Sequence, residues 1–402
     1  MEYLPYIVSW NITGRCNLKC PHCYMDSTEG LLSQELTTDE ARLVIDELTY
    51  LNRNLMLVLS GGEPMLRDDI YEIISYAREG GFIVVMGSNG TLIKEEGLRL
   101  LKEAGLMGLG ISIDFIEPSR HDAFRGMNGA WEQAFYVLRR AKELGIETQM
   151  DVTLTDQNYQ DIERFVELGA ELSLKALNFF FLVCTGRARK TDISTVNYNS
   201  ALRKLTELTL SEKRLMVRAR CAPHIYRLIY ERGARIPKGM RGCLAARHYM
   251  RITPDGYITP CPYMDLKAGD LREESVEEIW NKAPLMNILR RDSYSGRCGS
   301  CEYQVICGGC RARAYAEGGD LMAEDSLCDY TPSGRPVEEG ESFSSTLQWD
   351  EEARRRIERI PIFMRGMIVR MIETRARQLG IEVITSEFID ELKMHALGMH
   401  RK

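Results

Sequence analysis

The sequence lacks long apolar runs, an excess of basic residues and internal repeats, and each absence argues against a class of protein. No stretch approaches the roughly 20 apolar residues that a membrane-spanning helix requires. The first residues lack the basic segment and apolar run of a secretion signal, so we expect a cytoplasmic protein without a membrane partner. A formal charge of -6 argues against a nucleic-acid partner, because binding phosphates requires a basic surface.

The composition is otherwise that of a globular protein, except for the cysteines. Hydrophobic residues make up 44% and charged residues 27% of the 402 residues, which predicts a soluble chain of more than one domain. The 12 cysteines are unexpected, because the cytosol disfavours disulfides. Three lie between residues 16 and 23 and seven between 243 and 328, while Cys184 and Cys221 stand apart. Such clustering is typical of metal ligation.

Short apolar runs alternate with amphipathic stretches over the first half of the chain. The predicted strands are residues 7–12, 55–59, 82–86, 108–113, 148–153 and 177–182. The predicted helices between them are residues 39–51, 68–77, 94–104, 130–144 and 159–168, with Thr38 as the N-cap of the first. Nearly continuous apolar strands that alternate with helices predict a parallel sheet covered by helices. Six units are too few for a closed eight-stranded barrel, so we expect an α/β fold with a partial (β/α)6 barrel.

The remaining chain divides by composition. We expect the barrel to cover residues 1–190, followed by an Arg- and Lys-rich connecting region, 191–240, and a cysteine-rich domain, 241–332. Residues 346–402 have helical periodicity and predict a small helical domain. Pro361 is expected to divide it, and a last helix is expected from about Thr385 through Leu397.

The first cysteine cluster follows the first predicted strand directly. Cys16, Cys20 and Cys23 are spaced C-x3-C-x2-C. Three thiolates can hold three irons of a 4Fe–4S cluster and leave the fourth iron open to a small molecule. The alternative is a zinc site with His22 as fourth ligand, but zinc sites usually use paired C-x2-C elements. We therefore interpret the triplet as a catalytic iron–sulfur site.

This pattern, with the aromatic Tyr24 after it, resembles the radical S-adenosylmethionine (SAM) superfamily. Gly61-Gly62-Glu63-Pro64 after the second strand resembles the motif whose backbone and Glu contact the SAM amino group. The stretch 121–126 resembles the one whose arginine pairs with the SAM carboxylate, as Arg can bind such a group bidentately. The resemblance implies a SAM-binding set of Gly61, Gly62, Glu63, Pro64, Asn89, Ser112 and Arg125.

The resemblance also implies the chemistry of an enzyme. The reduced cluster of such proteins cleaves SAM to methionine and a 5′-deoxyadenosyl radical, which removes hydrogen from an unactivated carbon. The cofactor carries this step, and the protein positions it and excludes solvent. A low-potential electron donor such as ferredoxin or flavodoxin is implied as a partner.

The second cysteine cluster resembles the SPASM domain, which carries auxiliary 4Fe–4S clusters. It begins with C-x12-G-x4-C and continues with C-x2-C-x5-C-x2-C, whose insert is too short for a zinc ribbon. The resemblance implies one cluster on Cys298, Cys301, Cys307 and Cys328. The other would be on Cys243, Cys261 and Cys310.

One ligand of that other cluster is missing. The pattern has a further cysteine six positions after the first, where this chain has Tyr249. Either Cys221 supplies the fourth thiolate, or one iron is open and could touch substrate. Cys221 could equally be a buried structural thiol. One or two auxiliary clusters are therefore expected.

Five further stretches resemble the siroheme-dependent haem synthesis enzymes, haem d1 relatives included. They are residues 181–187, 220–224, 242–245, 268–272 and 310–316. The resemblance implies an iron tetrapyrrole substrate whose propionate side chains are oxidatively decarboxylated. The tail resembles a helical domain of a light-independent protochlorophyllide reductase subunit, with a generic dimerisation appendage as the alternative.

Substrate carboxylates require Arg partners, and His224 is a candidate for contacting the substrate iron. The candidate arginines are Arg187, Arg189, Arg218, Arg220 and Arg227. Two alternative functions remain. SPASM domains also serve in peptide maturases, and a non-catalytic electron carrier would bind iron–sulfur clusters but would have no use for the SAM-contacting residues.

Overall fold

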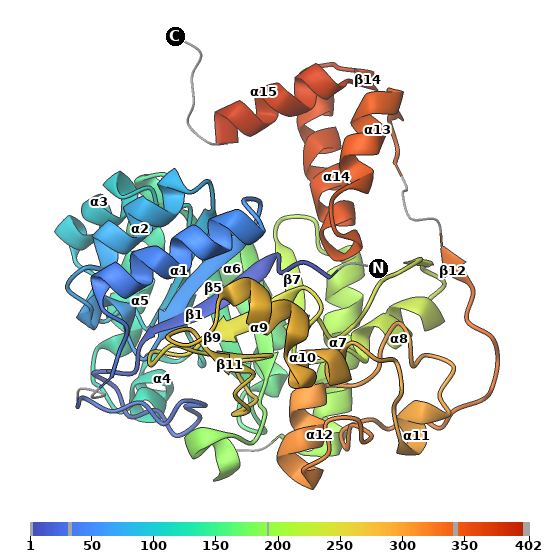
Figure 1. Cartoon of the computed structure of the whole chain (residues 1–402), viewed down its shortest axis with the longest axis horizontal. Coiled ribbons are helices and arrows are strands. Elements are labelled where there is room, and N and C mark those ends of the chain that lie inside the picture. Colours follow the sequence, from blue (N-terminus) through green and yellow to red (C-terminus); the bar gives the residue numbers. More distant parts are fainter. Residues whose placement is uncertain (1–2, 31–33, 191–192, 341–344, 397–402) are drawn as a thin grey trace. The chain divides into compact units, whose positions relative to one another are not determined.

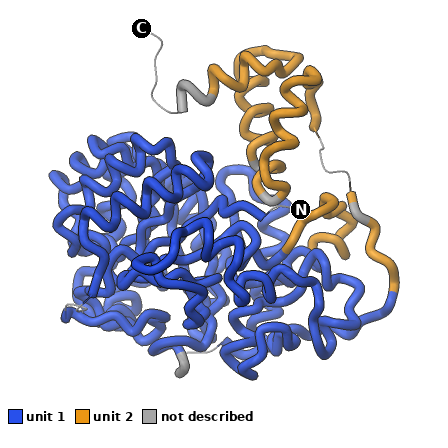
Figure 2. Tube along the Cα trace, in the orientation of Figure 1, with its two compact units in different colours: residues 1–228, 242–334 blue, residues 229–241, 335–402 orange. Residues whose placement is uncertain are grey.

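The computed structural model describes residues 3–30, 34–190, 193–340 and 345–396. Its chain forms two compact units, coloured in Figure 2. Unit 1 comprises residues 1–228 and 242–334, and unit 2 comprises residues 229–241 and 335–402. The barrel and the cysteine-rich segment therefore belong to one compact body. The four domains expected from the sequence were divided by composition and motifs, whereas the two units are divided by contacts in space. The four-domain division stays a prediction.

Unit 1 is built on one open ten-stranded sheet in the order β11-β10-β9-β1-β2-β3-β4-β5-β6-β7 (Figure 1). Strands β1 to β7 are parallel and follow one another in sequence order. Their bounds are β1 (Ile7–Thr13), β2 (Met56–Gly61), β3 (Ile83–Ser88), β4 (Gly108–Ser112), β5 (Glu147–Leu154), β6 (Ala176–Phe181) and β7 (Met216–Arg220). The predicted α/β fold with an open parallel sheet is confirmed.

Helices cover one face of this sheet. They are α1 (Thr38–Leu51), α2 (Ile70–Glu79), α3 (Glu95–Glu103), α4 (Pro118–Arg125), α5 (Ala130–Glu143), α6 (Ile162–Glu171) and α7 (Thr195–Ser211). Phe179 of β6 packs against Phe165 of α6 on this helix-covered face. Side chains alternate along a strand, so Asn178 and Phe180, the neighbours of Phe179, point to the other face. We call that other face the inner face. In β5, residues alternate between buried and partly accessible, and Asp151 is on the inner side.

The structure corrects two local predictions. No strand was predicted in the connecting region, but this region contains α7 and β7, and β7 pairs parallel with β6. The sequence signal was weak because only Val217 is fully buried in β7, while Arg218 and Arg220 occupy the other face. Secondly, the N-cap of α1 is Thr37, not Thr38, because Thr37 and Glu40 form a reciprocal capping box.

The cysteine-rich segment extends the same sheet. Strand β9 (Tyr249–Ile252) pairs parallel with β1, and β10 (Tyr257–Thr259) and β11 (Gly269–Asp270) follow antiparallel. Short helices complete it: α9 (Val276–Lys282), α10 (Pro284–Leu289), α11 (Gly296–Gly299) and α12 (Arg311–Gly318). The buried Trp280 donates to the carbonyl of Tyr3 at 2.7 Å, which fastens this segment to the start of the chain.

Unit 2 has its own small core. It contains α13 (Glu351–Glu358), α14 (Ile362–Gln378), α15 (Ser386–Ala396) and the paired strands β13 (Gln348–Trp349) and β14 (Val383–Ile384). A second pair joins β8 (Ile236–Pro237) to β12 (Glu339–Gly340). Trp349, Ile357 and Ile372 are buried in the core. Pro361 divides the helices as predicted, and Leu397 lies outside the described residues. Among the described residues, no helix has the length and apolar character needed to cross a membrane.

Candidate functional site

Cys16, Cys20 and Cys23 form what we call the first cysteine group, on the loop that follows β1. Burial raises the pKa of Cys16 to about 11, and the neighbouring thiols of Cys20 and Cys23 add to the rise. The Leu18 N–H donates to the Cys16 sulfur at 3.4 Å. Buried thiols must be stabilised by positive charge to be thiolate ligands. A cationic iron–sulfur cluster supplies that charge, so this donor set fits such a group.

The loop is shaped by a residue more than 160 positions away in the sequence. The Arg187 guanidinium donates to the carbonyl of Cys20 at 3.0 Å and pairs with Asp26 at 2.7 Å. The backbone of Gly186 is equally close, since a Cβ there would lie 2.6 Å from the Cys23 carbonyl oxygen. The structure thus places Arg187 on the cysteine loop. The side chain of Arg189, another candidate, lies outside the described residues.

The Gly61–Pro64 segment lies directly against this loop. Gly61 ends β2 with a φ of 128°, which favours glycine. A Cβ on Gly62 would lie 1.9 Å from the carbonyl oxygen of Arg15. The Glu63 N–H donates to the same oxygen at 2.7 Å. The two glycines are therefore required by the close approach of two backbone segments.

Glu63 joins this segment to the end of β3. Its fully buried carboxylate accepts hydrogen bonds from the Ser88 hydroxyl and the Asn89 N–H, each at 2.8 Å. Burial raises the pKa of Glu63, and these hydrogen bonds partly oppose the rise. The Asn89 amide in turn donates to Asn17 at 3.0 Å and lies 4.0 Å from the Cys16 sulfur. The predicted residues after β1, β2 and β3 therefore meet at the carboxyl edge of the sheet.

Arg125 reaches the first cysteine group from the end of α4. It is buried, and its Nη1 lies 3.8 Å from the Cys20 sulfur. Its Nε and Nη2 pair with the fully buried Asp114 at 2.8 and 2.6 Å. Ser112, two residues before Asp114, ends β4 opposite Asp151 of β5. The stretch 112–114 is at the end of a predicted strand, where barrel active sites lie, but the sequence assigned no role to Asp114 itself.

The zinc alternative named His22, which has a different role. Its ring stacks on Phe124 at 4.7 Å, and burial lowers its pKa to about 4. Its Nε2 lies 3.8 Å from Asp114. Among the described residues, no three His, Cys, Asp or Glu side chains converge on a single metal ion. All twelve cysteines are free thiols.

Eight other cysteines fall into two groups of four. The second cysteine group comprises Cys221, Cys243, Cys261 and Cys310. These thiols lie close enough together that they raise one another's pKa. Burial raises the pKa of Cys221, and Cys310 and Cys243 raise it further. Cys221 has a φ of 57°, a strained backbone conformation for a residue other than glycine. The structure thus brings Cys221 to the group that lacked a fourth ligand.

The third cysteine group comprises Cys298, Cys301, Cys307 and Cys328. Burial raises the pKa of Cys301 to about 11, with Cys328 and Cys298 among its neighbours. The four thiols line one cavity together with Arg227. Arg227 pairs with Asp329 at 3.3 Å and lies over the Tyr330 ring. The structure therefore places Arg227 at this cavity.

Tyrosines that the sequence analysis did not assign lie between the first and second groups. Tyr249 is in β9, and burial raises its pKa, which Cys261 and Cys221 raise further. The Tyr24 and Tyr263 rings lie 5.1 Å apart, and the Tyr24 hydroxyl accepts from Asn11 at 2.9 Å. The pKa of Tyr24 is raised by burial and also by Cys23, whereas that of Tyr263 is raised by burial and also by Cys221.

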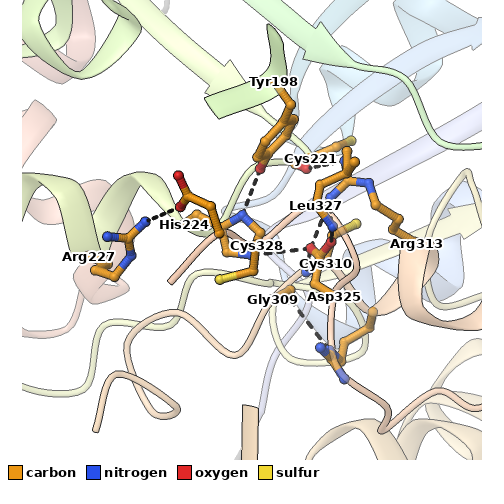
Figure 3. A network of polar contacts seen from close by, with 12 residues as sticks. Tyr198, Cys221, His224, Arg227, Gly309, Cys310, Arg313, Asp325, Leu327 and Cys328 are labelled. Carbon is orange, nitrogen blue, oxygen red and sulfur yellow. Dashed lines mark hydrogen bonds and ion pairs between the residues drawn. The ribbon is translucent and has the colours of Figure 1, made fainter. Parts of the chain in front are cut away.

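His224 lies in a buried polar network close to the third cysteine group. It is buried, its Nδ1 lies 2.9 Å from the Tyr198 hydroxyl, and its Nε2 lies 3.4 Å from Asp325 (Figure 3). The sequence pointed to His224 only as a histidine and did not indicate its partners. Its neighbours come from α7 and from the segment near Cys328, which only the fold brings together.

Arg218 and Arg220 lie on the inner face of β7, where they share a polar cluster with Asp151 and Asn178. The Asn178 amide donates to Asp151 at 2.7 Å, and Arg220 donates to Asn178 at 3.1 Å. Burial raises the pKa of Asp151, and both arginines oppose the rise. Burial also lowers the pKa of Arg218 to about 10. Two guanidinium groups and one buried carboxylate therefore lie together on this face of the sheet.

Comparison with protein families identifies the chain. Residues 10–169 match the radical SAM superfamily, and residues 243–302 match an iron–sulfur cluster-binding domain of the SPASM type. The AdoMet-dependent heme synthase of Methanosarcina barkeri is 36% identical, over 83% of this chain and 98% of that protein. This chain belongs to the radical SAM superfamily. It is an enzyme that binds a 4Fe–4S cluster, SAM and auxiliary iron–sulfur clusters.

Other comparisons give one further relative, one similar fold and a second family match. The AdoMet-dependent heme synthase of Nitratidesulfovibrio vulgaris is 37% identical, over 81% of this radical SAM enzyme and 92% of that protein. Streptococcus suis SuiB, solved with bound S-adenosylmethionine, shares the fold with a TM-score of 0.68 at 18% identity, over 82% of this chain and 78% of that one. Residues 349–393 match the proto-chlorophyllide reductase 57 kD subunit family.

Proposed function

We propose that this radical SAM enzyme oxidatively decarboxylates propionate side chains of an iron tetrapyrrole, with Fe-coproporphyrin as substrate. The naming of the two relatives as AdoMet-dependent heme synthases supports this proposal, because the similarity spans nearly all of each protein. The observation that carries it is the pair Arg218 and Arg220 on the inner face of the sheet. That face also holds Ser112 and Asp151, which are opposite each other in β4 and β5.

The arginine pair suits a substrate with carboxylate side chains. Guanidinium groups bind carboxylates through two parallel hydrogen bonds. Arg218 and Arg220 both lower the pKa of the buried Asp151 carboxylate, which places two guanidinium groups together on the inner face. Arg218 is also largely desolvated, which strengthens its attraction for an anion.

The residue roles follow from the three cysteine groups. Cys16, Cys20 and Cys23 would hold the catalytic cluster, and the second and third groups would hold two auxiliary clusters, with Cys221 as the fourth ligand of one. SAM would be bound by Gly61, Gly62, Glu63, Pro64, Asn89, Ser112 and Arg125. Arg125 would serve the SAM carboxylate while Asp114 holds its guanidinium in place. The domains would be 1–190 for radical SAM, 191–240 connecting, 241–332 for SPASM and 346–402 for the helical tail.

The reaction must remove three things from each propionate: a hydrogen atom, CO2 and one electron, which leaves a vinyl group. SAM bound at the catalytic cluster supplies the 5′-deoxyadenosyl radical that takes the hydrogen atom. Arg218 and Arg220 would hold the substrate carboxylate and fix which carbon faces the first cysteine group. The second cysteine group would hold an iron–sulfur cluster that can take up the electron. A cytoplasmic ferredoxin or flavodoxin would supply the reducing electron for SAM cleavage.

The test is anaerobic incubation of the reconstituted enzyme with Fe-coproporphyrin, SAM and dithionite, read by mass spectrometry. One or two successive decarboxylations are expected, with one 5′-deoxyadenosine formed for each. Formation of 5′-deoxyadenosine with unchanged Fe-coproporphyrin, together with turnover of a peptide, would instead favour the maturase alternative.

A matched pair of variants tests the arginine site. Arg220→Gln is expected to weaken Fe-coproporphyrin binding, measured by absorbance titration without SAM. Arg214→Gln removes an exposed arginine just before the same strand, where Arg214 pairs with Glu167 at 2.8 Å. This control should bind as the unmodified protein does, and equal binding by both variants would remove Arg220 from the site.

A further inference from the structure

The Asp325 carboxylate lies between two cysteine groups and is fully buried. It accepts hydrogen bonds from the Cys310 N–H at 2.7 Å and the Leu327 N–H at 3.2 Å. Arg313, on α12, pairs with both of its oxygens through Nη1, at 2.9 and 3.1 Å. Figure 3 shows this pair at the centre of its polar network.

The same pair contacts further cysteine segments. Arg313 Nη2 donates to the carbonyl of Cys221 at 3.0 Å. The Cys328 N–H donates to the backbone carbonyl of Asp325 at 3.1 Å. Cys221 and Cys310 belong to the second cysteine group, and Cys328 belongs to the third. The contact with Cys328 runs through the backbone, and the Asp325 side chain reaches the third group through the N–H of Leu327, directly before Cys328. The ion pair therefore contacts ligand segments of both groups, which come from distant parts of the sequence.

The surroundings keep this pair dry and fixed. Arg313 is 1% exposed, and its guanidinium lies 5.2 Å from the centre of the Tyr198 ring. His224, also 1% exposed, lies 3.4 Å from Asp325 through Nε2. A buried ion pair contributes little net stability compared with apolar side chains of the same size. In such surroundings, however, charges act strongly on their neighbours because water does not screen them.

We propose that Arg313 and Asp325 are positioning residues that hold the two auxiliary clusters in a fixed relation and jointly set their reduction potentials. This rests on the proposed assignment of the second and third cysteine groups as ligands. It does not depend on the porphyrin substrate, because both clusters can be titrated in its absence.

The two charges predict shifts of opposite sign. Asp325→Asn keeps the shape of the side chain but removes the negative charge and leaves the Arg313 cation beside the clusters. Reduction adds an electron, so the reduction potentials of both auxiliary clusters should rise. Arg313→Gln leaves the Asp325 carboxylate alone, so both potentials should fall. Arg313→Lys keeps the charge and should restore the potentials most of the way.

The experiment uses the full chain, reconstituted anaerobically, with iron analysis and redox titrations followed by electron paramagnetic resonance. The control is Glu95→Gln, which breaks a surface ion pair with Arg140 of 2.7 Å. It should leave every potential unchanged. Opposite shifts in both auxiliary signals support the proposal. Unchanged potentials with full iron content, or shifts of the same sign in both variants, overturn it.

A variant that loses iron is equally decisive. Loss of both auxiliary clusters, with SAM cleavage by the first group retained, supports the positioning role of the ion pair. Loss of only one auxiliary cluster, with the potential of the other unchanged, overturns the link between them. An unmodified protein that holds only one auxiliary cluster refutes the ligand assignment itself, whatever the outcome with Fe-coproporphyrin.

Discussion

The first cysteine group and the second are built in opposite ways. Cys16, Cys20 and Cys23 come from one loop after β1, and the ends of β2 and β3 support that loop. The second group gathers thiols from residue 221 to residue 310, on segments that follow β7, β10 and other elements. A local ligand set depends on loop shape, whereas a dispersed one depends on the whole fold. Four substitutions, from the largest expected effect to the smallest, test this difference.

Replacing Cys20 by Ala should have the largest effect. If Cys20 is a ligand of the catalytic cluster as proposed, SAM cleavage should fall by more than the roughly 10- to 100-fold that loss of an outer contact costs at a metal site. Both auxiliary clusters should remain, because the second and third groups share no segment with this loop. The measurements are 5′-deoxyadenosine formation and iron content. Loss of the auxiliary clusters as well would show that the groups are not independent.

Gly62→Ala should damage the same site without touching a ligand. The added Cβ would lie 1.9 Å from the Arg15 carbonyl oxygen, and a backbone group cannot yield cheaply. Overpacking of this kind costs roughly 1–3 kcal/mol or more, so SAM cleavage should fall sharply. Gly318→Ala is the control, since nothing lies within 4 Å of its added Cβ. Normal SAM cleavage by Gly62→Ala would mean that this contact does not shape the loop.

Cys221→Ala should separate the two kinds of site. We expect loss or conversion of one auxiliary cluster, seen in iron content and electron paramagnetic resonance, with SAM cleavage retained. Decarboxylation should stop if that cluster takes the electron. Cys184→Ala is the matched control and should keep all iron. Unchanged iron and spectra in Cys221→Ala would exclude this thiol as a ligand.

Tyr249→Phe should have the smallest effect. Tyr249 stands where the resemblance expects a cysteine, and its neighbours include Cys261 and Cys221. If Cys221 completes the ligand set, removal of the hydroxyl costs only its hydrogen bond to Ser9, about 1 kcal/mol. Iron content should stay the same, with at most a small spectroscopic shift. A lost cluster would identify Tyr249 as the ligand.

Helices and strands could be predicted where one feature of the sequence, such as a continuous apolar run or a proline, was clear. The buried strands β1 to β6 are apolar enough to be predicted from the sequence. Pro361, which cannot donate a backbone hydrogen bond inside a helix, lies between α13 and α14. Strand β7 was missed because its inner face holds Arg218 and Arg220, which read as surface charge. The contacts of His224 with Asp325 and of Arg187 with Cys20 could not be predicted, because an arginine or histidine alone does not reveal the partners that the fold supplies.

The sequence by itself determined the chemistry of this protein, because ligand spacing over a few residues fixes which thiols can share an iron–sulfur cluster. It also determined the glycines that let the Gly61–Pro64 segment approach the first group. Only the tertiary structure decided that Cys221 joins Cys243, Cys261 and Cys310, and that Arg313 and Asp325 fasten two groups together. These contacts join residues far apart in the chain, and such contacts form only when the sheet and the cysteine-rich segment pack into one body.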